Sequence, residues 1–297
     1  MSNKSRSNRA RRRHSRRGNQ PSFSDKAKRL VPLVAVPTVV LTVGYMAMAS
    51  YLDAERMNES THCYDNRVDY EVAFFVEASF NKDISDKQSG DFDQVLVNAF
   101  GDLPPNGRLS VFTTSRQAAQ TVVDPVLVTC RPASSEAEQD AIGIGDKNPV
   151  QLKVDGEKAL DAYRAKIQDV IRQAADPDLG ANNSPIIETV RSISRYYGPG
   201  ELDQLHMWTD GVNNSAARQM CVTKGHLLPY PNFPKSRDYR YLKPESLAGV
   251  AVNFWLVEHI KFPNPSAPFC TNYEIRDWWA AFMGDHGAVV DMEYLAY

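Results

Sequence analysis

The chain has 297 residues, of which 24% are charged and 42% are hydrophobic. This composition is ordinary for a folded protein with a sizeable core and excludes a wholly disordered or fibrous chain. The formal net charge of −2 hides an asymmetry, because residues 1–29 hold eleven basic side chains and one acidic side chain. This basic tail therefore carries +10 and the remainder −12. An acidic remainder is a poor candidate for nucleic-acid binding, so any polyanion binding belongs to the tail.

An uncharged stretch of 23 residues, Leu30–Leu52, follows the basic tail. A helix of this length is sufficient to cross a hydrocarbon core of about 30 Å. Basic residues precede the stretch, and Asp53 and Glu55 follow it. The positive-inside rule then places the N-terminus in the cytoplasm and the rest of the chain in the periplasm or outside the cell. The sequence predicts a protein that spans the cytoplasmic (inner) membrane once.

The basic tail and the apolar stretch have alternative interpretations as export signals. Ala47-Met48-Ala49 has the small-x-small form of a signal-peptide cleavage site, but the apolar run is longer than the core of a usual signal peptide. Arg16-Arg17 fits a twin-arginine export signal poorly, because a charged stretch separates it from the apolar run. The basic tail can contact anionic lipid head groups or cytoplasmic nucleic acid, or only set the topology, and we favour topology.

The four cysteines, Cys63, Cys130, Cys221 and Cys270, all follow the expected membrane helix. They would then lie in an oxidising compartment, where disulfides persist. Their spacings match no zinc pattern, and three pairings are possible from sequence alone. We favour Cys221 with Cys270, because both follow expected strands in the second half of the chain, which leaves Cys63 near Cys130.

Residues 53–70 are polar and predict a stalk, and residues 71–297 alternate between strand-like and helix-like patterns. This alternation predicts an α/β domain with a doubly wound sheet and helices on both faces. The expected strands are Val72–Val76, Arg108–Thr114, Pro125–Cys130, Leu202–Trp208, Gly249–Val257 and Ala288–Leu295, and the expected helices are Ile84–Leu103, Asp155–Ala175, Ser184–Tyr197 and Tyr273–Phe282. Two long irregular segments are expected at Arg131–Val150 and in the Pro-rich stretch Leu228–Pro244.

Polar side chains follow two of the expected strands. Glu77-x-Ser79-x-Asn81 comes after the first strand and Thr209-Asp210-Gly211 after a later one, and Ser184 opens the helix between them. In an open α/β sheet the ligand site lies at the carboxyl ends of the strands, where the strand order reverses. Carboxylate, hydroxyl and amide oxygens are the ligands that a hard divalent cation prefers.

At these residues the sequence resembles the von Willebrand factor A family, whose metal-ion-dependent adhesion site combines Asp-x-Ser-x-Ser, a later Thr and an Asp within Thr/Ser-Asp-Gly. The resemblance implies a Rossmann-like fold in which Ser79, Asn81 and Ser184 hold Mg²⁺ or Mn²⁺. It also implies that Glu77 and Asp210 act mostly through water. The sequence departs from the family pattern, since Glu77 replaces Asp, Asn81 replaces Ser and Ser184 replaces Thr. A longer carboxylate and a neutral amide carbonyl should lower the metal affinity.

The resemblance implies a module that binds a protein partner, with a partner carboxylate completing the metal shell, and the expected membrane helix would anchor this module. By analogy it could serve an envelope assembly such as a secretion or conjugation apparatus. The alternative is an extracytoplasmic metal-dependent hydrolase that uses Glu77 and Asp210, although the sequence carries no catalytic motif. In a third interpretation the site is degenerate and its side chains only make structural hydrogen bonds. Taken by itself, Ser184 is expected to be the N-cap of the helix that it opens, and this role is compatible with metal binding. We expect His206 to lie in the core. We also expect a core position for the aromatic residues, with an aromatic ligand platform as their alternative role: Tyr239, Tyr241, Phe254, Trp255, Trp278 and Trp279.

Overall fold

The structure is a computed structural model that describes residues 57–64, 68–77, 84–114, 122–144, 148–174, 184–221, 229–258 and 270–296. Residues 56–297 form one compact unit. The predicted basic tail and the predicted membrane segment Leu30–Leu52 lie outside the described residues. Among the helices that are described, none is both long and apolar enough to cross a membrane.

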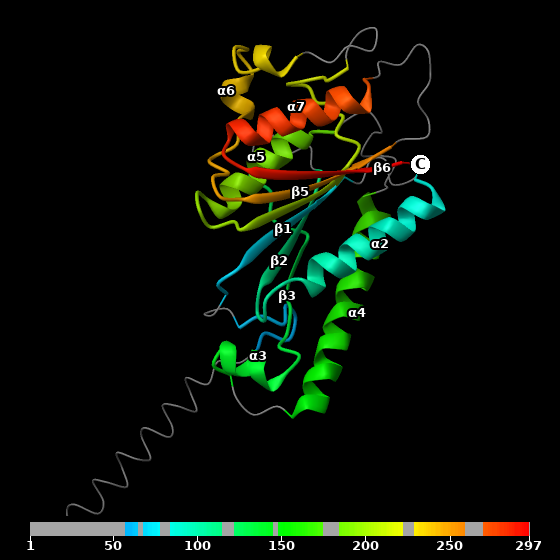
Figure 1. The fold of residues 1–297 in the computed structure, drawn as a ribbon, viewed down its shortest axis with the longest axis vertical. Helices are drawn as coiled ribbons and strands as arrows, with labels where there is room; N and C mark the ends of the chain where they lie inside the picture. The colour runs from blue at the N-terminus through cyan, green and yellow to red at the C-terminus, as the bar shows by residue number, and fades with distance from the viewer. Residues whose placement is uncertain are drawn as a thin grey trace, which may run out of the picture. The chain divides into compact units, whose positions relative to one another are not determined.

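A six-stranded mixed sheet forms the centre of the compact unit (Figure 1). Its strand order is β3-β2-β1-β4-β5-β6, and only β3 runs antiparallel to its neighbour. The strands are β1 Glu71–Val76, β2 Arg108–Thr113, β3 Leu127–Cys130, β4 Gln204–Thr209, β5 Ala251–Val257 and β6 Val289–Leu295. The predicted α/β class is thereby confirmed, and all six strands fall within two residues of the predicted bounds.

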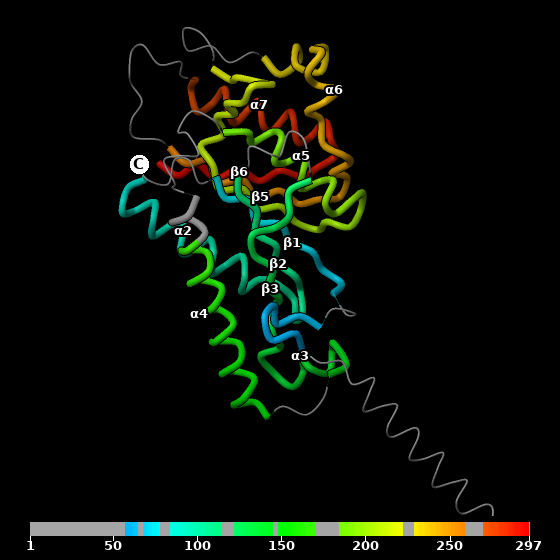
Figure 2. The backbone as a smooth tube through the Cα atoms, turned by 180° about the vertical axis from the view of Figure 1, so that it is seen from behind, coloured from blue at the N-terminus to red at the C-terminus, as the bar shows by residue number. Residues whose placement is uncertain are grey.

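Helices flank the sheet on both faces (Figures 1 and 2). The α2 and α4 helices pack on one face, and α5 and α7 pack on the other. The helices are α2 Asp86–Gly101, α3 Glu136–Ala141, α4 Pro149–Ala174, α5 Ile186–Tyr197, α6 Tyr239–Leu242 and α7 Asn272–Asp285, with a short 3₁₀ helix, η3, at Tyr230–Asn232. Helices on both faces are what a largely parallel sheet needs, since its strands are buried on both sides.

The central strand β1 shows why its apolar run is unbroken. Val72, Phe74 and Val76 point into the core beneath α2 and α4, whereas Ala73 and Phe75 point into the core beneath α5 and α7. All five side chains are at most 1% exposed. Alternate residues of a strand face opposite sides of the sheet, so a strand covered on both faces has no position for a polar side chain.

The segment predicted as a long loop, Arg131–Val150, contains the helix α3 and the first residues of α4, so that prediction was wrong. The side-chain oxygen of Ser135 caps α3 by accepting from the Glu138 amide, and Arg131 binds the Glu138 carboxylate with a 2.8 Å contact. An exposed six-residue helix carries too few apolar residues for periodicity to reveal it. The side-chain cap and the ion pair hold α3 in place, and neither contact is visible in the periodicity of the sequence.

Both disulfides have the favoured pairing, Cys63 with Cys130 and Cys221 with Cys270. The first ties residues from the predicted stalk to the end of β3. Tyr64 is buried, and its backbone amide donates to the side-chain oxygen of Asn106 over 2.8 Å. The described residues before β1 therefore pack on the domain, at least at Cys63 and Tyr64.

Candidate functional site

The candidate site lies where β1 and β4 end side by side. The two strands are parallel neighbours in register, with Val76 opposite Trp208, and the Glu77 amide donates to the Trp208 carbonyl over 2.9 Å. The next strand after β1 in the chain, β2, lies on the other side of β1 from β4. The strand order therefore reverses between β1 and β4, which is the position where open α/β sheets bind ligands.

Glu77 is the central side chain of the site. It is 1% exposed, and each of its carboxylate oxygens accepts a hydroxyl hydrogen bond: Oε1 from Ser184 and Oε2 from Thr209. A buried carboxylate is stable only when such donors or a cation replace the water it has lost. The structure thus brings together the predicted residues Glu77 and Ser184, and it adds Thr209.

The position of Ser184 differs from the predicted one. We expected an N-cap, but α5 begins at Ile186, its cap position is Pro185, and no side chain caps it there. Ser184 instead forms a two-way backbone bridge with Asn214, with N···O distances of 2.6 and 2.8 Å, which holds its hydroxyl toward Glu77. The N-cap prediction was wrong because a long-range partner competes for the hydroxyl.

Asn213 performs the capping function that Ser184 does not. Its Oδ1 accepts from the Ile187 amide over 2.8 Å, and its Nδ2 donates to the Arg218 carbonyl over 2.8 Å. Asn213 is fully buried and follows the Thr209-Asp210-Gly211 turn by two residues. Sequence reasoning missed it, because an Asn in a loop gives no local sign that it caps a helix distant in the chain.

The turn after β4 needs its glycine. Gly211 has φ +72°, and a Cβ atom added there would lie 2.7 Å from Ile275 Cγ2 and 3.0 Å from Leu256 Cδ1. The Trp279 indole donates to the Gly211 carbonyl over 2.8 Å. The turn is thus pressed against α7 and β5, and only glycine tolerates both the close approach and the positive φ.

Asp210 completes the acid pair, the name used here for Glu77 and Asp210. The Asp210 Oδ1 accepts from the Val212 amide over 2.8 Å, which favours the ionised carboxylate. Burial and then the nearby charge of Glu77 act in the opposite direction and raise the pKa of Asp210 well above its ordinary value. Two carboxyl groups this close disfavour double ionisation, and either a shared proton or a cation relieves the repulsion.

The other predicted ligands, Ser79 and Asn81, lie outside the described residues. Within the described ranges no group of three or more His, Cys, Asp and Glu side chains could hold a metal ion. The donors that the structure does bring together at the acid pair are two carboxylates and the hydroxyls of Ser184 and Thr209. All are hard oxygen donors, which suit Mg²⁺ and Mn²⁺ by chemical type.

Another buried acid, outside the acid pair, is Glu188. Glu188, in the first turn of α5, is 0% exposed, and its Oε1 accepts from the Ser215 hydroxyl. Its Oε2 has no hydrogen-bond partner among the described residues, and burial raises the pKa of the carboxyl. Sequence reasoning missed Glu188, although an acid next to the apolar positions Ile187 and Val190 was the available signal.

The expected core residues divide into two groups. His206 is 5% exposed and stacks against both Phe74 and Trp255, with ring centroids 5.7 and 5.2 Å away, and burial lowers its pKa to about 4. The packed imidazole is confirmed. Trp278, Trp279 and Phe254 are also in the core, but Tyr241 is 54% exposed, so the core prediction was wrong for it.

No protein-family model matches this chain, and no curated protein matches its sequence. Its own residues determine what the site can bind. These are a buried glutamate held by two hydroxyls, an aspartate with a raised pKa, and a glycine turn packed against α7.

Proposed function

We propose that this protein is a membrane-anchored protein-interaction module whose partner site is the acid pair, with Mg²⁺ or Mn²⁺ bound there. The observation that carries the proposal is the meeting of Glu77 and Asp210 at the reversal of strand order, beside the hydroxyls of Ser184 and Thr209. Each of these residues lies at or next to the end of a strand or the start of a helix. The sheet and the helix therefore hold their side chains in position.

Electrostatics favour a cation at this position. A carboxyl group whose pKa is raised by burial and by a neighbouring carboxylate is stabilised by positive charge. Glu77, Asp210, Ser184 and Thr209 would hold the cation directly or through water, together with Ser79 and Asn81 as the family resemblance implies. When bound, the cation would offer an open coordination position to a carboxylate of the partner.

The strand order supports the resemblance to the von Willebrand factor A family at the level of fold. That resemblance implies a Rossmann-like sheet with its ligand site at the reversal of strand order, and β3-β2-β1-β4-β5-β6 has its reversal between β1 and β4. The residues of the expected motif that are described, Glu77, Ser184 and Asp210, all lie there. Fold alone does not determine function, so the acid pair carries the proposal.

The anchored arrangement follows from the apolar stretch Leu30–Leu52 and the basic tail before it. We place the domain outside the cytoplasmic membrane, and the two disulfides support an oxidising compartment. A single helix with a basic tail could couple a partner outside to one inside, as in an envelope assembly.

Cation-dependent cross-linking in the cells that make the protein tests this function. A photo-reactive residue would replace Val212, which is partly exposed beside the acid pair. We expect a defined protein adduct that disappears when a chelator removes divalent cations and when Asp210 is changed to Asn. An adduct of the same yield with chelator and with Asp210→Asn would show that the partner site lies elsewhere or needs no cation.

A further inference from the structure

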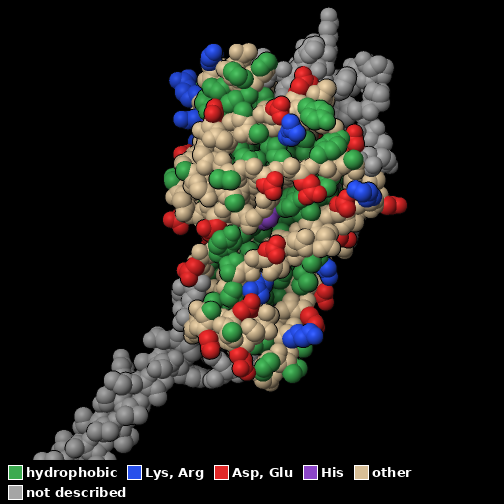
Figure 3. All heavy atoms as spheres, viewed as in Figure 1, with side chains coloured by type: hydrophobic (Ala, Val, Ile, Leu, Met, Phe, Trp, Pro, Cys, Tyr) green, Lys and Arg blue, Asp and Glu red, His purple; other side chains and the backbone are tan. Residues whose placement is uncertain are grey.

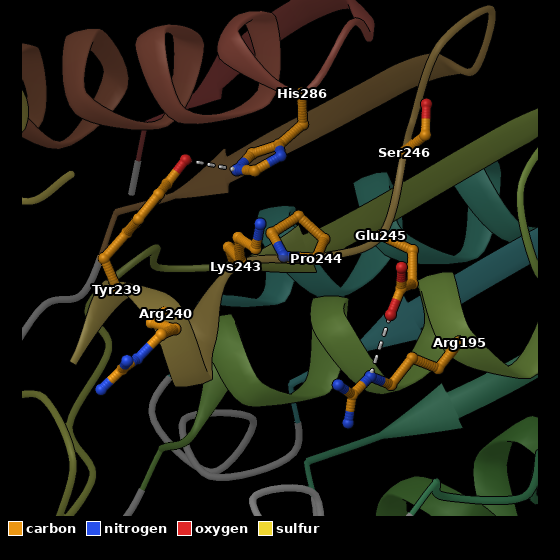
Figure 4. A pocket seen from close by; sticks show the side chains of 8 residues that line it. All are labelled: Arg195, Tyr239, Arg240, Lys243, Pro244, Glu245, Ser246 and His286. Carbon is orange, nitrogen blue, oxygen red and sulfur yellow. Dashed lines mark hydrogen bonds and ion pairs between the residues drawn. The ribbon is translucent and has the colours of Figure 1, made fainter. Parts of the chain in front are cut away.

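A cavity (Figure 4) lies at the last turn of α5, whereas the acid pair lies near the first turn of that helix. Its volume is about 300 Å³, and its walls come from the last turn of α5, from α6 and the segment that follows it, and from the end of α7. The lining residues are Arg195, Tyr239, Arg240, Lys243, Pro244, Glu245, Ser246 and His286. Since the 12 residues of α5 span about 18 Å, this cavity is separate from the acid pair.

The charge of the cavity is opposite to that of the domain around it. Three cationic side chains line it, Arg195, Arg240 and Lys243, against one carboxylate, Glu245. The chain after the basic tail carries −12. Figure 3 shows Lys and Arg side chains gathered over the part of the compact unit where Figure 1 labels α6.

One cation is already matched. Arg195 Nε lies 3.4 Å from Glu245 Oε1, and the two side chains are directed toward each other in Figure 4. Arg240 stacks over the Tyr241 ring, with its guanidinium carbon 5.2 Å from the centroid and its side chain directed away from His286. Lys243, which is exposed, makes no side-chain ion pair or hydrogen bond within the described residues. Two cationic side chains therefore remain without a carboxylate partner in the cavity.

Helix C-termini account for part of this charge. Cations are favoured there because the terminus of a helix carries about half a negative charge. Arg195 lies in the last turn of α5 and is explained in this way. The α6 helix has only four residues, so its dipole is too small to balance both Arg240 and Lys243.

His286 adds a neutral hydrogen-bonding group to the cavity. Its Nε2 shares a 3.2 Å hydrogen bond with the Tyr239 hydroxyl. Burial lowers the pKa of His286, the charge of Asp285 raises it, and the charge of Lys243 lowers it. Lys243 and the imidazole are thus close enough to influence each other, and an anion between them would raise the pKa of His286.

We propose that this cavity binds a phosphate group, held by Lys243 with Arg240 at its rim and the His286 imidazole beside it. The charge match selects the ligand class, because a phosphate monoester carries about −1.5 to −2 near pH 7 and balances two cations, whereas a carboxylate balances one. Lysine ammonium and arginine guanidinium groups both commonly bind phosphate, as hydrogen-bond donors that carry positive charge. The phosphate can belong to a small metabolite or to a lipid head group.

Titration of the full-length chain with inorganic phosphate tests the proposal, with short-chain phosphatidic acid, a lipid whose head group is a phosphate monoester, below its micelle concentration as a second arm. The readout is the imidazole resonance of His286, together with calorimetry. Lys243→Gln removes the charge, and Lys166→Gln, at an exposed position on α4, is the matched control. Thermal unfolding of both variants confirms that they fold.

We expect saturable binding that raises the pKa of His286 and weakens about tenfold in Lys243→Gln but not in Lys166→Gln. Binding of the lipid alone, with the same dependence on Lys243, would support the site and identify a head group as the ligand. Binding that both variants retain equally, or no response of His286 to either compound, would overturn the proposal. Because none of these substitutions touches the acid pair, failure here leaves the proposed interaction function standing.

Discussion

Strand β1 begins with Glu71 and is followed directly by Glu77, and the two carboxylates have different surroundings. At the amino end, Arg108 binds Glu71 through two hydrogen bonds, and its Nε lies 3.0 Å from Glu71 Oε2. At the carboxyl end, Glu77 accepts from two hydroxyls and lies close to a second acid, Asp210. The amino end pairs its glutamate with an arginine, although burial and the nearby Asp203 raise the pKa of Glu71, whereas the carboxyl end brings two carboxyl groups together.

The same contrast extends to neighbouring strands. Since β3 is antiparallel, its last residues lie at the amino ends of the others, where Arg131 binds Glu138. Acids at that end serve stability. Gathering two carboxyls at the other end costs stability unless a positive charge is bound, and such local cost is typical of functional sites.

The largest expected effect is at the carboxyl end. Asp210→Asn keeps the shape of the side chain but removes one charge of the acid pair, so we expect the affinity for Mn²⁺ to fall about 100-fold. Calorimetry or the electron paramagnetic resonance signal of free Mn²⁺ measures the change. Glu71→Gln is the control, and it should bind Mn²⁺ as the wild type does. Equal losses in both variants would mean that the two ends do not differ in function.

The second prediction concerns pH. The pKa of Asp210 is raised in the folded state, so its contribution to stability is fully present below the ordinary pKa of about 4 and is lost as the pH rises through the folded pKa. Without divalent cations the free energy of unfolding should therefore fall over this range, and Asp210→Asn should reduce that fall. Chemical denaturation at a series of pH values measures it. A wild type and variant with parallel pH profiles would show that Asp210 does not titrate in this way.

A smaller effect is expected at the amino end. Glu71→Gln removes the carboxylate that binds Arg108, whose side chain is 34% exposed, so water can replace part of the lost interaction. We expect a loss of about 1 to 2 kcal/mol in the free energy of unfolding. Urea denaturation of this variant, of Arg108→Gln and of the double variant isolates the pair. An additive double variant would show that the ion pair contributes nothing.

The smallest effect is at Glu138. Burial raises its pKa, but hydrogen bonds from Arg131 and Ser134 dominate and lower it to about 2. Its contribution to stability is present above the ordinary carboxyl pKa and is lost as the pH falls toward 2. In Arg131→Gln, NMR titration should find the pKa of Glu138 closer to its ordinary value. An unchanged pKa would assign the shift to Ser134 and the backbone alone.

Sequence alone predicted the elements whose signal is local. The run Val72–Val76 fixed β1 because a strand buried on both faces has no polar position, and the apolar spacing of α2 fixed that helix. The disulfide pairing followed from where the strands end. The short helix α3 was missed because its stability comes from a cap and an ion pair.

The candidate site was predicted only in part for a related reason. Glu77 and Asp210 follow strands, and their meeting could be expected from the fold class. The N-cap prediction for Ser184 was wrong, because whether its hydroxyl caps a helix or donates to Glu77 depends on Asn213 and Asn214, which lie in a distant loop. Side-chain choice between a local and a long-range partner is set by the tertiary structure.

The most direct test of the central claim is calorimetric titration of Mg²⁺ and Mn²⁺ into the full-length chain, repeated in buffers with different ionisation enthalpies. Burial and Glu77 raise the pKa of Asp210, and a cation that enters the acid pair would lower it, so we predict one saturable site, proton release on binding, and loss of both in Glu77→Gln. The absence of a saturable site, or binding that Glu77→Gln retains, would contradict the account and leave the acid pair as a structural carboxyl pair.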